Sequence, residues 1–210
     1  MRKFKVLMLF PCLLLLGVVQ GQTNVLPEIG ASYITNNLDN QETRLYDFLA
    51  FTFNPRILLT QRSNHSVSID LPFAIRTKSR DERSTRLGIL IPAVAMFNFG
   101  AGSVSTPNQA TVGFAAGGGW GYFYQRTRSE IDETPQYIES LSSHGPIVRA
   151  GIRIPHRKYT LFRYKDNRAY PVSSIKINYL VNLSGNQKSM GSLSWLIGLG
   201  FEVLFFVESE

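Results

Sequence analysis

Few residues in this chain of 210 have the types and spacing that catalysis or metal binding needs. The three histidines, His65, His144 and His156, have no metal-ligand spacing and belong to no cluster of cysteines or carboxylates. The nearest approach to a catalytic motif is Ser142-Ser143-His144, where two hydroxyl groups precede a residue able to act as a general base. Adjacent residues of these types more often form a turn. We therefore predict no catalytic residues, no cofactor site and no metal site.

Charge argues against nucleic acid as a partner. The formal net charge is +7, but Arg2, Lys3 and Lys5 belong to an amino-terminal segment that we expect to be removed. Without them, 19 basic residues stand against 15 acidic ones, which is too small an excess to indicate binding to a phosphate backbone.

The first 22 residues have the three parts of a secretory signal peptide. Basic residues come first, an apolar run covers 6–19, and Gln20, Gly21 and Gln22 are small or polar. The run is shorter than the roughly 20 residues that a membrane-spanning helix needs. We predict that residues 1–21 are removed by cleavage between Gly21 and Gln22, which leaves an exported chain of residues 22–210.

The rest of the chain alternates between large apolar residues and small or polar ones, which is the period of a β-strand. The clearest examples are residues 67–75 and 175–183, where every second residue is large and apolar. Turn-forming residues separate such segments. The pattern predicts eight strands, at 28–36, 44–60, 65–77, 86–99, 110–126, 147–156, 172–183 and 189–206. The longest intervening segment, 127–146, is predicted to be a loop.

Two prolines fall inside the predicted strands, where each removes one hydrogen bond from the sheet. The turn between the two strands is centred near Asp81 and Glu82, so Pro72 and Pro92 are expected to lie roughly opposite each other. We therefore expect one local irregularity, such as a bulge, to accommodate both prolines.

The small residues of the strands indicate which face meets water. In residues 112–124 the large residues alternate with a column of small ones, Gly113, Ala115, Gly117, Gly119 and Gly121. A soluble strand would expose lysine, glutamate or threonine there, whereas a small closed barrel needs small residues inside. The predicted fold is therefore all-β, an eight-stranded antiparallel up-and-down transmembrane β-barrel whose bulky apolar side chains face outward.

Charged residues are rare in the strands, and their positions agree with this fold. Of the seven charges there, Asp47 alone falls on the apolar face, near a strand end. The other six are predicted to point into the barrel, namely Arg56, Asp70, Arg149, Arg153, Lys176 and Glu202. They are expected to form a hydrogen-bonded plug with Thr52, Asn54, Asn98, Asn178, Ser192 and Ser194. Four cations against two anions leave a positive excess, so water, Asp47, Glu42 or an anion must contribute.

Several strands end in aromatic residues, which is typical of the girdles that membrane barrels place at the two interfaces. Trp120, Tyr122 and Tyr124 close one strand, and Phe97 and Phe99 close another. With the segments 90–100, 112–122, 145–153 and 197–201, the chain resembles the small outer-membrane β-barrel proteins of Gram-negative bacteria, the porin-like eight-stranded type. It departs from that pattern at its end, because such proteins often finish on an aromatic residue and this chain continues through 207–210.

The resemblance implies a monomeric, non-enzymatic protein of the outer membrane, surrounded by outer-membrane lipid. Both termini are then expected in the periplasm, with residues 37–43, 78–85, 127–146 and 184–188 facing outward. The implied role is structural or interactive, through contact of 127–146 with an extracellular or surface ligand, and with at most a narrow pore.

Two other classes of protein remain open. A soluble exported barrel of the lipocalin type would bind a small apolar ligand, with faces such as Ile175 and Ile177 lining its cavity. A lipid-modifying hydrolase is the other, since some similar barrels deacylate lipid A with a histidine and a serine near the outer rim. In this sequence Ser142, Ser143 and His144 would have to supply that chemistry.

Overall fold

The structure is a computed structural model, and it describes residues 25–39, 46–77, 85–105, 109–129, 137–156, 162–164, 167–183 and 192–209. The predicted signal peptide, with Gly21 and Gln22 at its cleavage site, lies outside these residues, as does Glu42. Within the described segments, no helix is long and apolar enough to cross a membrane.

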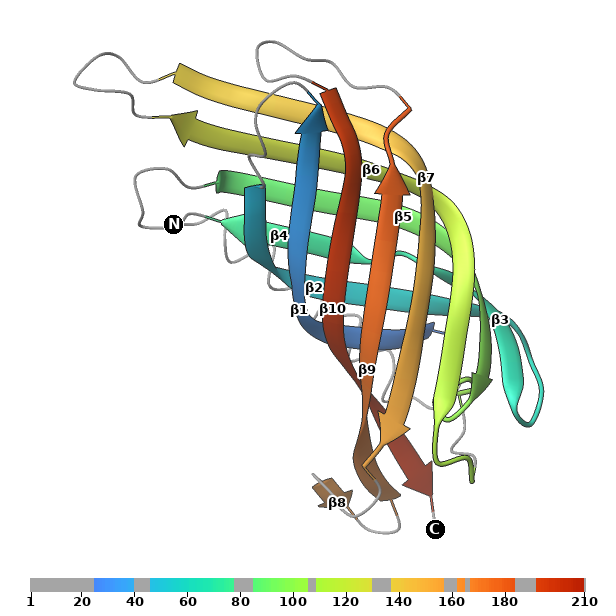
Figure 1. Ribbon diagram of the computed structural model, residues 1–210. Helices are drawn as coiled ribbons and strands as arrows, with labels where there is room; N and C mark the ends of the chain where they lie inside the picture. The colour runs from blue at the N-terminus through green and yellow to red at the C-terminus, as the bar shows by residue number, and fades with distance from the viewer. Residues whose placement is uncertain are drawn as a thin grey trace.

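In these segments ten strands form one antiparallel sheet that closes on itself (Figure 1). The sheet closes because β1 (Val25–Asp39) pairs with both β2 (Tyr46–Gln61) and β10 (Ser192–Ser209). The other strands are β3 (His65–Asp70), β4 (Phe73–Thr77), β5 (Thr85–Gly100), β6 (Gly113–Ser129), β7 (Tyr137–Pro155), β8 (Phe162–Tyr164) and β9 (Asn167–Val181).

The barrel wall has eight strand positions. β3 and β4 share one of them, because both lie between β2 and β5, and the short β8 pairs with β9 off the main path. The predicted eight-stranded antiparallel barrel is therefore confirmed. We call the end of the barrel that carries Val25 and Ser209 the terminal end, and the end that carries the β6–β7 hairpin the hairpin end.

The two prolines lie opposite each other, as predicted. Asp70 pairs with Val94 and Ala74 pairs with Leu90, so the register brings Pro72 opposite Pro92. Strand structure is interrupted at residues 71–72, where the N–H of Leu71 donates to the carbonyl of Pro55 at 3.1 Å. One interruption thus accommodates both prolines.

The prediction that 127–146 is a loop was wrong. β6 and β7 pair without interruption from Gly113 with Arg153 to Ser129 with Tyr137, so 127–129 and 137–146 belong to strands. β7 pairs with β9 only from Ile147 onward, apart from one bond from the N–H of Leu183 to the carbonyl of His144. The hairpin therefore extends past the wall, and its β7 half lacks the apolar alternation that a wall strand needs.

Side chains alternate between the two faces of the wall. Outward-facing residues such as Phe51, Val148 and Ile177 are 53%, 59% and 54% exposed, whereas their neighbours along each strand are mostly buried. Gly117 and Gly121 of β6 face a crowded interior, because Cβ atoms there would meet the side chains of Met96 and Leu180. Bulky residues therefore lie outside and small ones inside, as a narrow barrel requires.

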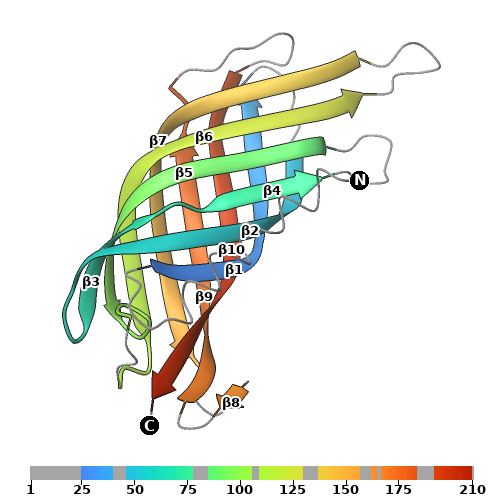
Figure 2. The same cartoon turned by 180° about the vertical axis from the view of Figure 1, so that it is seen from behind.

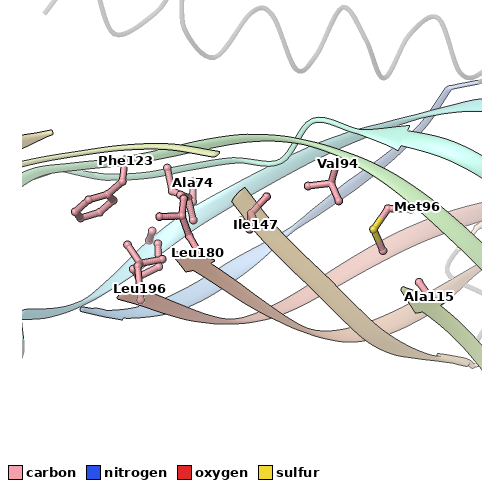
Figure 3. Packing of buried hydrophobic residues seen from close by; sticks show 11 residues of the cluster. Ala74, Val94, Met96, Ala115, Phe123, Ile147, Leu180 and Leu196 are labelled. Atoms are coloured by element: carbon pink, nitrogen blue, oxygen red, sulfur yellow. The ribbon is translucent and has the colours of Figure 1, made fainter. Parts of the chain in front are cut away.

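Apolar side chains fill both ends of the interior. Val172 in β9 packs with Leu26, Leu58 and Leu204 near the terminal end. Leu180, eight residues along the same strand, belongs to a larger cluster nearer the hairpin end (Figure 3). Lys176 lies between Val172 and Leu180 on this strand. The members of the larger cluster are Ile34, Ala50, Ala74, Leu90, Val94, Met96, Ala115, Phe123, Ile147, Leu180 and Leu196.

Candidate functional site

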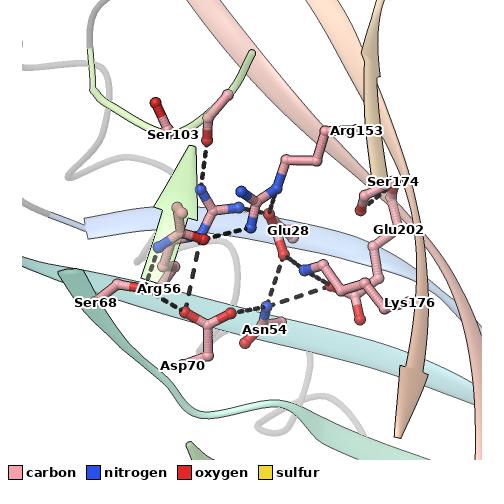
Figure 4. Close-up of polar contacts among 12 residues, drawn as sticks. Glu28, Asn54, Arg56, Ser68, Asp70, Ser103, Arg153, Ser174, Lys176 and Glu202 are labelled. Atoms are coloured by element: carbon pink, nitrogen blue, oxygen red, sulfur yellow. Dashed lines mark hydrogen bonds and ion pairs between the residues drawn. The ribbon is translucent and has the colours of Figure 1, made fainter. Parts of the chain in front are cut away.

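The six charged residues predicted to point inward are all buried inside the barrel. Arg56, Lys176 and Glu202 lie along their strands between members of the two apolar clusters, and Figure 4 shows them close together with Asp70 and Arg153. The six residues come from five strands of the wall, and each is at most 1% exposed. Strand alternation places them there, because each has the parity of the buried residues on its strand. They are Arg56 in β2, Asp70 in β3, Arg149 and Arg153 in β7, Lys176 in β9 and Glu202 in β10.

A seventh charge, Glu28 in β1, completes the group and was missed by the sequence analysis. Its carboxylate forms ion pairs with Arg56 and Lys176, and a longer one of 3.7 Å with Arg153. β1 begins at Val25, whereas the predicted strand began at residue 28, so Glu28 stood at its very first position and was not counted among the inward-facing charges. The parity of Leu26, which is also buried, could have found it. We call these seven residues the ionic cluster.

The other two carboxylates of the ionic cluster are also well supplied with partners. Glu202 accepts from Arg149 Nη2 at 2.5 Å and from Lys176 Nζ at 2.7 Å. Asp70 accepts from Ser68 Oγ at 2.8 Å and lies 3.9 Å from Arg56 Nε. The amide of Asn54 donates to all three carboxylates, at 2.7 Å to Glu28 and 3.3 Å to each of the others. One side chain thus ties the three anions together.

The neutral residues predicted for the plug take part to different extents. Asn98 links Arg153, at 2.8 Å, to Ser68, at 2.9 Å, and Thr52 bonds to Ser32 at 2.7 Å. Asn178 is buried, but its Oδ1 atom has no hydrogen-bond partner among the described residues. The side chains of Asp47, Ser192 and Ser194 lie outside the described part of the structure.

Residues 101–104, which follow β5, fold inward and cover the ionic cluster from the terminal end. Gly100 and Gly102 have φ angles of 74° and 67°, a conformation that glycine adopts without steric cost. The turn that they allow brings the Gly102 carbonyl to 2.6 Å from Arg56 Nη1. Ser66 donates to the carbonyl of Ser103, and Ala101 and Val104 are buried beside it. The lumen is therefore filled at this end by backbone as well as by side chains.

The Ser142-Ser143-His144 motif is not assembled into a catalytic site. Ser143 points inward and donates to Asn182 Oδ1 at 2.6 Å. His144 points outward, where its ring lies 5.8 Å from the ring of Trp120. Alternation along β7 thus separates the two groups that a hydrolase would need to bring together. No group of three potential metal ligands occurs among the described residues.

A shallow groove of about 840 Å³ lies on the outer face of the wall, across β5, β6, β7, β9 and β10. Its floor includes Ala116 and Ala150, and aromatic residues such as Phe97, Phe114 and Phe201 line its sides. The hydrogen-bonded pair of His156 Nε2 and Ser173 Oγ, 2.9 Å apart, supplies its polar lining. The groove is thus a depression in the apolar exterior of the barrel.

A closed eight-stranded antiparallel barrel with an apolar exterior and a polar centre is the architecture of the small outer-membrane β-barrels, and this chain has that fold. Among solved structures it is similar to Ail, the attachment invasion locus protein of Yersinia pestis. The two share 12% sequence identity with a TM-score of 0.52, over 86% of this chain and 96% of Ail.

Two further solved structures were found at lower similarity. Ail in complex with the heparin analogue sucrose octasulfate has 11% identity and a TM-score of 0.49, over 86% of this chain and 96% of that chain. Neisserial surface protein A has 9% identity and a TM-score of 0.45, over 90% of this chain and 98% of that chain. No protein-family model matches the sequence, and neither does any curated protein.

Proposed function

We propose that residues 22–210, after removal of a signal peptide at 1–21, form a non-enzymatic integral protein of the outer membrane that acts through contacts at the hairpin end. The observation that carries the proposal is the exterior of the barrel, where large hydrophobic side chains from all eight strand positions are exposed. Continuous apolar surface of this extent is unfavourable in water, and a lipid bilayer is the solvent that it suits.

The interior argues against a soluble barrel of the lipocalin type. That class would place faces such as Ile175 and Ile177 around a central cavity, but both side chains are more than half exposed on the outside. The interior is instead occupied by the ionic cluster and the two apolar clusters. The bulky and small faces are thus arranged as a membrane barrel needs them.

The β6–β7 hairpin is the part best placed to meet a partner. In the described chain, residues 137–143 of β7 pair with β6 alone, and Figures 1 and 2 show the hairpin projecting past its neighbours. A hairpin that leaves the wall stands in water and presents both faces to other molecules. We propose that this end faces outward, that both termini lie in the periplasm, and that the protein binds a surface ligand as a monomer.

Fractionation of cells tests the proposed location. We expect the protein in the outer-membrane fraction, with a mobility in gel electrophoresis that changes between unboiled and boiled samples, because a closed barrel resists detergent until heated. A variant with Gly21→Leu would test the signal peptide, and its uncleaved precursor should accumulate. Recovery of the protein as a freely soluble periplasmic species, without detergent, would contradict the proposal.

Protease treatment of intact cells tests the orientation. We expect the first cut in 130–136, the segment that joins β6 to β7, because segments between strands are cleaved before paired strands. Its sequence contains Glu130, Glu133 and Asp132 and no lysine or arginine, so a glutamate-specific protease is suitable. Cleavage of intact cells after Glu208, near the terminal end, with the hairpin left whole, would reverse the orientation.

Planar bilayers test whether the lumen conducts. We expect no large, steady conductance from the purified protein, since Leu180 and Val172 lie in apolar clusters on either side of the buried Lys176. Replacing Leu180 and Leu196 together by glycine should not open a pore, because the ionic cluster still fills the centre. A general-porin conductance from the unmodified protein would contradict a closed lumen.

A further inference from the structure

The ionic cluster carries an excess of positive charge. Among the fully buried residues in the described segments, the cations are Arg56, Arg149, Arg153 and Lys176, and the anions are Glu28, Asp70 and Glu202. Glu28 supplies part of the negative charge that the sequence analysis found missing, but among these described residues one positive charge still has no counterpart. An uncompensated charge in a water-poor interior is costly.

The surplus also shows in the hydrogen bonding of the two β7 arginines. Arg149 uses Nη2 for Glu202, and its Nε and Nη1 have no hydrogen-bond partner among the described residues. Arg153 uses Nη2 for Asn98, and its Nη1 has no hydrogen-bond partner among these residues. Its Nε lies 3.7 Å from Glu28 Oε1, which is an ion pair but too long for a hydrogen bond. Both side chains are 1% exposed, so bulk water does not satisfy these four nitrogen atoms.

The neighbouring strand β6 does not relieve this shortage. Arg149 pairs in register with Gly117, and Arg153 pairs with Gly113, so the positions opposite them carry no side chain. Between the two arginines on the same face of β7 lies Gly151. On its β6 side, the wall beside the two arginines is therefore lined by glycine and offers no carboxylate.

We propose that the barrel interior binds one small monovalent inorganic anion, of the halide class, between the side chains of Arg149 and Arg153. One such ion balances the charge of the cluster and accepts hydrogen bonds from the unpartnered guanidinium groups. A water molecule would accept the same hydrogen bonds but would leave the positive charge in place. The ion must be small, because the apolar clusters and the turn at Gly102 fill the interior on both sides. The site is independent of any contact at the hairpin end.

Thermal unfolding of the refolded full barrel in detergent tests this site, with the boiled-to-unboiled gel shift as the readout. The unfolding midpoint is measured in sodium chloride, in sodium bromide and in sodium gluconate at equal ionic strength, since gluconate is too large for the interior. We expect the midpoint to rise with halide concentration and then to saturate, with little rise in gluconate. Equal midpoints in halide and gluconate would overturn the proposal.

Two variants locate the effect. Arg153→Met removes the surplus charge, and we expect it to lose the difference between halide and gluconate. Arg126→Met removes an exposed cation on β6 and should keep the difference. If Arg153→Met retained it, the ion would not be bound here. Should that variant fail to fold, crystals of the unmodified protein soaked in bromide decide the question. An anomalous peak between Arg149 and Arg153 supports the site, and its absence there rejects it.

Discussion

Replacing Glu28 by glutamine is expected to lower the free energy of unfolding of the barrel by about 3–5 kcal/mol. The carboxylate forms ion pairs with Arg56, Lys176 and Arg153 and accepts from Asn54 at 2.7 Å. Glutamine keeps the shape of the side chain but removes its charge, so the remaining carboxylates Asp70 and Glu202 face four buried cations. The measurement is urea unfolding of the refolded protein in lipid vesicles, followed by tryptophan fluorescence.

Two further variants make this result specific to the ionic cluster. Arg126→Gln removes a charge that is exposed on β6, and we expect its effect to stay within about 0.5 kcal/mol. Adding Lys176→Met to Glu28→Gln removes one of the stranded cations, so the double variant should be more stable than the sum of the two single changes predicts. If Glu28→Gln unfolded at the same urea concentration as the unmodified protein, the cluster would not hold the strands together.

Period-two alternation was enough to predict the barrel and the parity of its charged residues. A shift of the strand register by one residue would turn every side chain of a strand to the other face. The regular alternation of 175–183 therefore fixes which of its side chains face inward. The same reasoning failed at Glu28, where the strand start was misjudged by three residues. A strand boundary is the point at which alternation has the fewest residues to fix it.

The apolar filling of the lumen could not be predicted from the pattern. Residues 87–97 are apolar on both faces, so alternation does not tell that Leu90, Val94 and Met96 face inward. Their partners, such as Ile34 and Leu196, lie far away along the chain, near its two ends, and meet them only when the barrel closes. Closure depends on how all the strands pair, so the alternation within a single strand does not predict these contacts.

The length of the β6–β7 hairpin could not be predicted from the sequence for a different reason. Strand pairing there depends on backbone hydrogen bonds between the two strands, and the β7 half contains Ser140, Ser142 and Ser143 instead of an apolar face. Serine-rich sequence is typical of turns, and it led to the prediction of a loop. The hairpin shows that a strand outside the membrane wall has no need of apolar alternation.

The second large effect on stability concerns the outward, apolar face of the barrel wall. Ile177→Arg is expected to destabilise the barrel in lipid vesicles by about 2–4 kcal/mol, the cost of arginine near the bilayer midplane. Ile177 is 54% exposed and pairs in register with Ala150 and Leu199, in the middle of the outward face of β9.

The matched control is Val181→Arg, on the same face of the same strand but at its end, where the expected cost falls to about 0–1 kcal/mol. Unfolding in urea from vesicles gives both values. The difference between the two positions is what distinguishes a membrane from water, because a charge on the exposed face of a soluble barrel costs little at either one. Equal, small effects at Ile177 and Val181 would mean that this face does not lie in lipid.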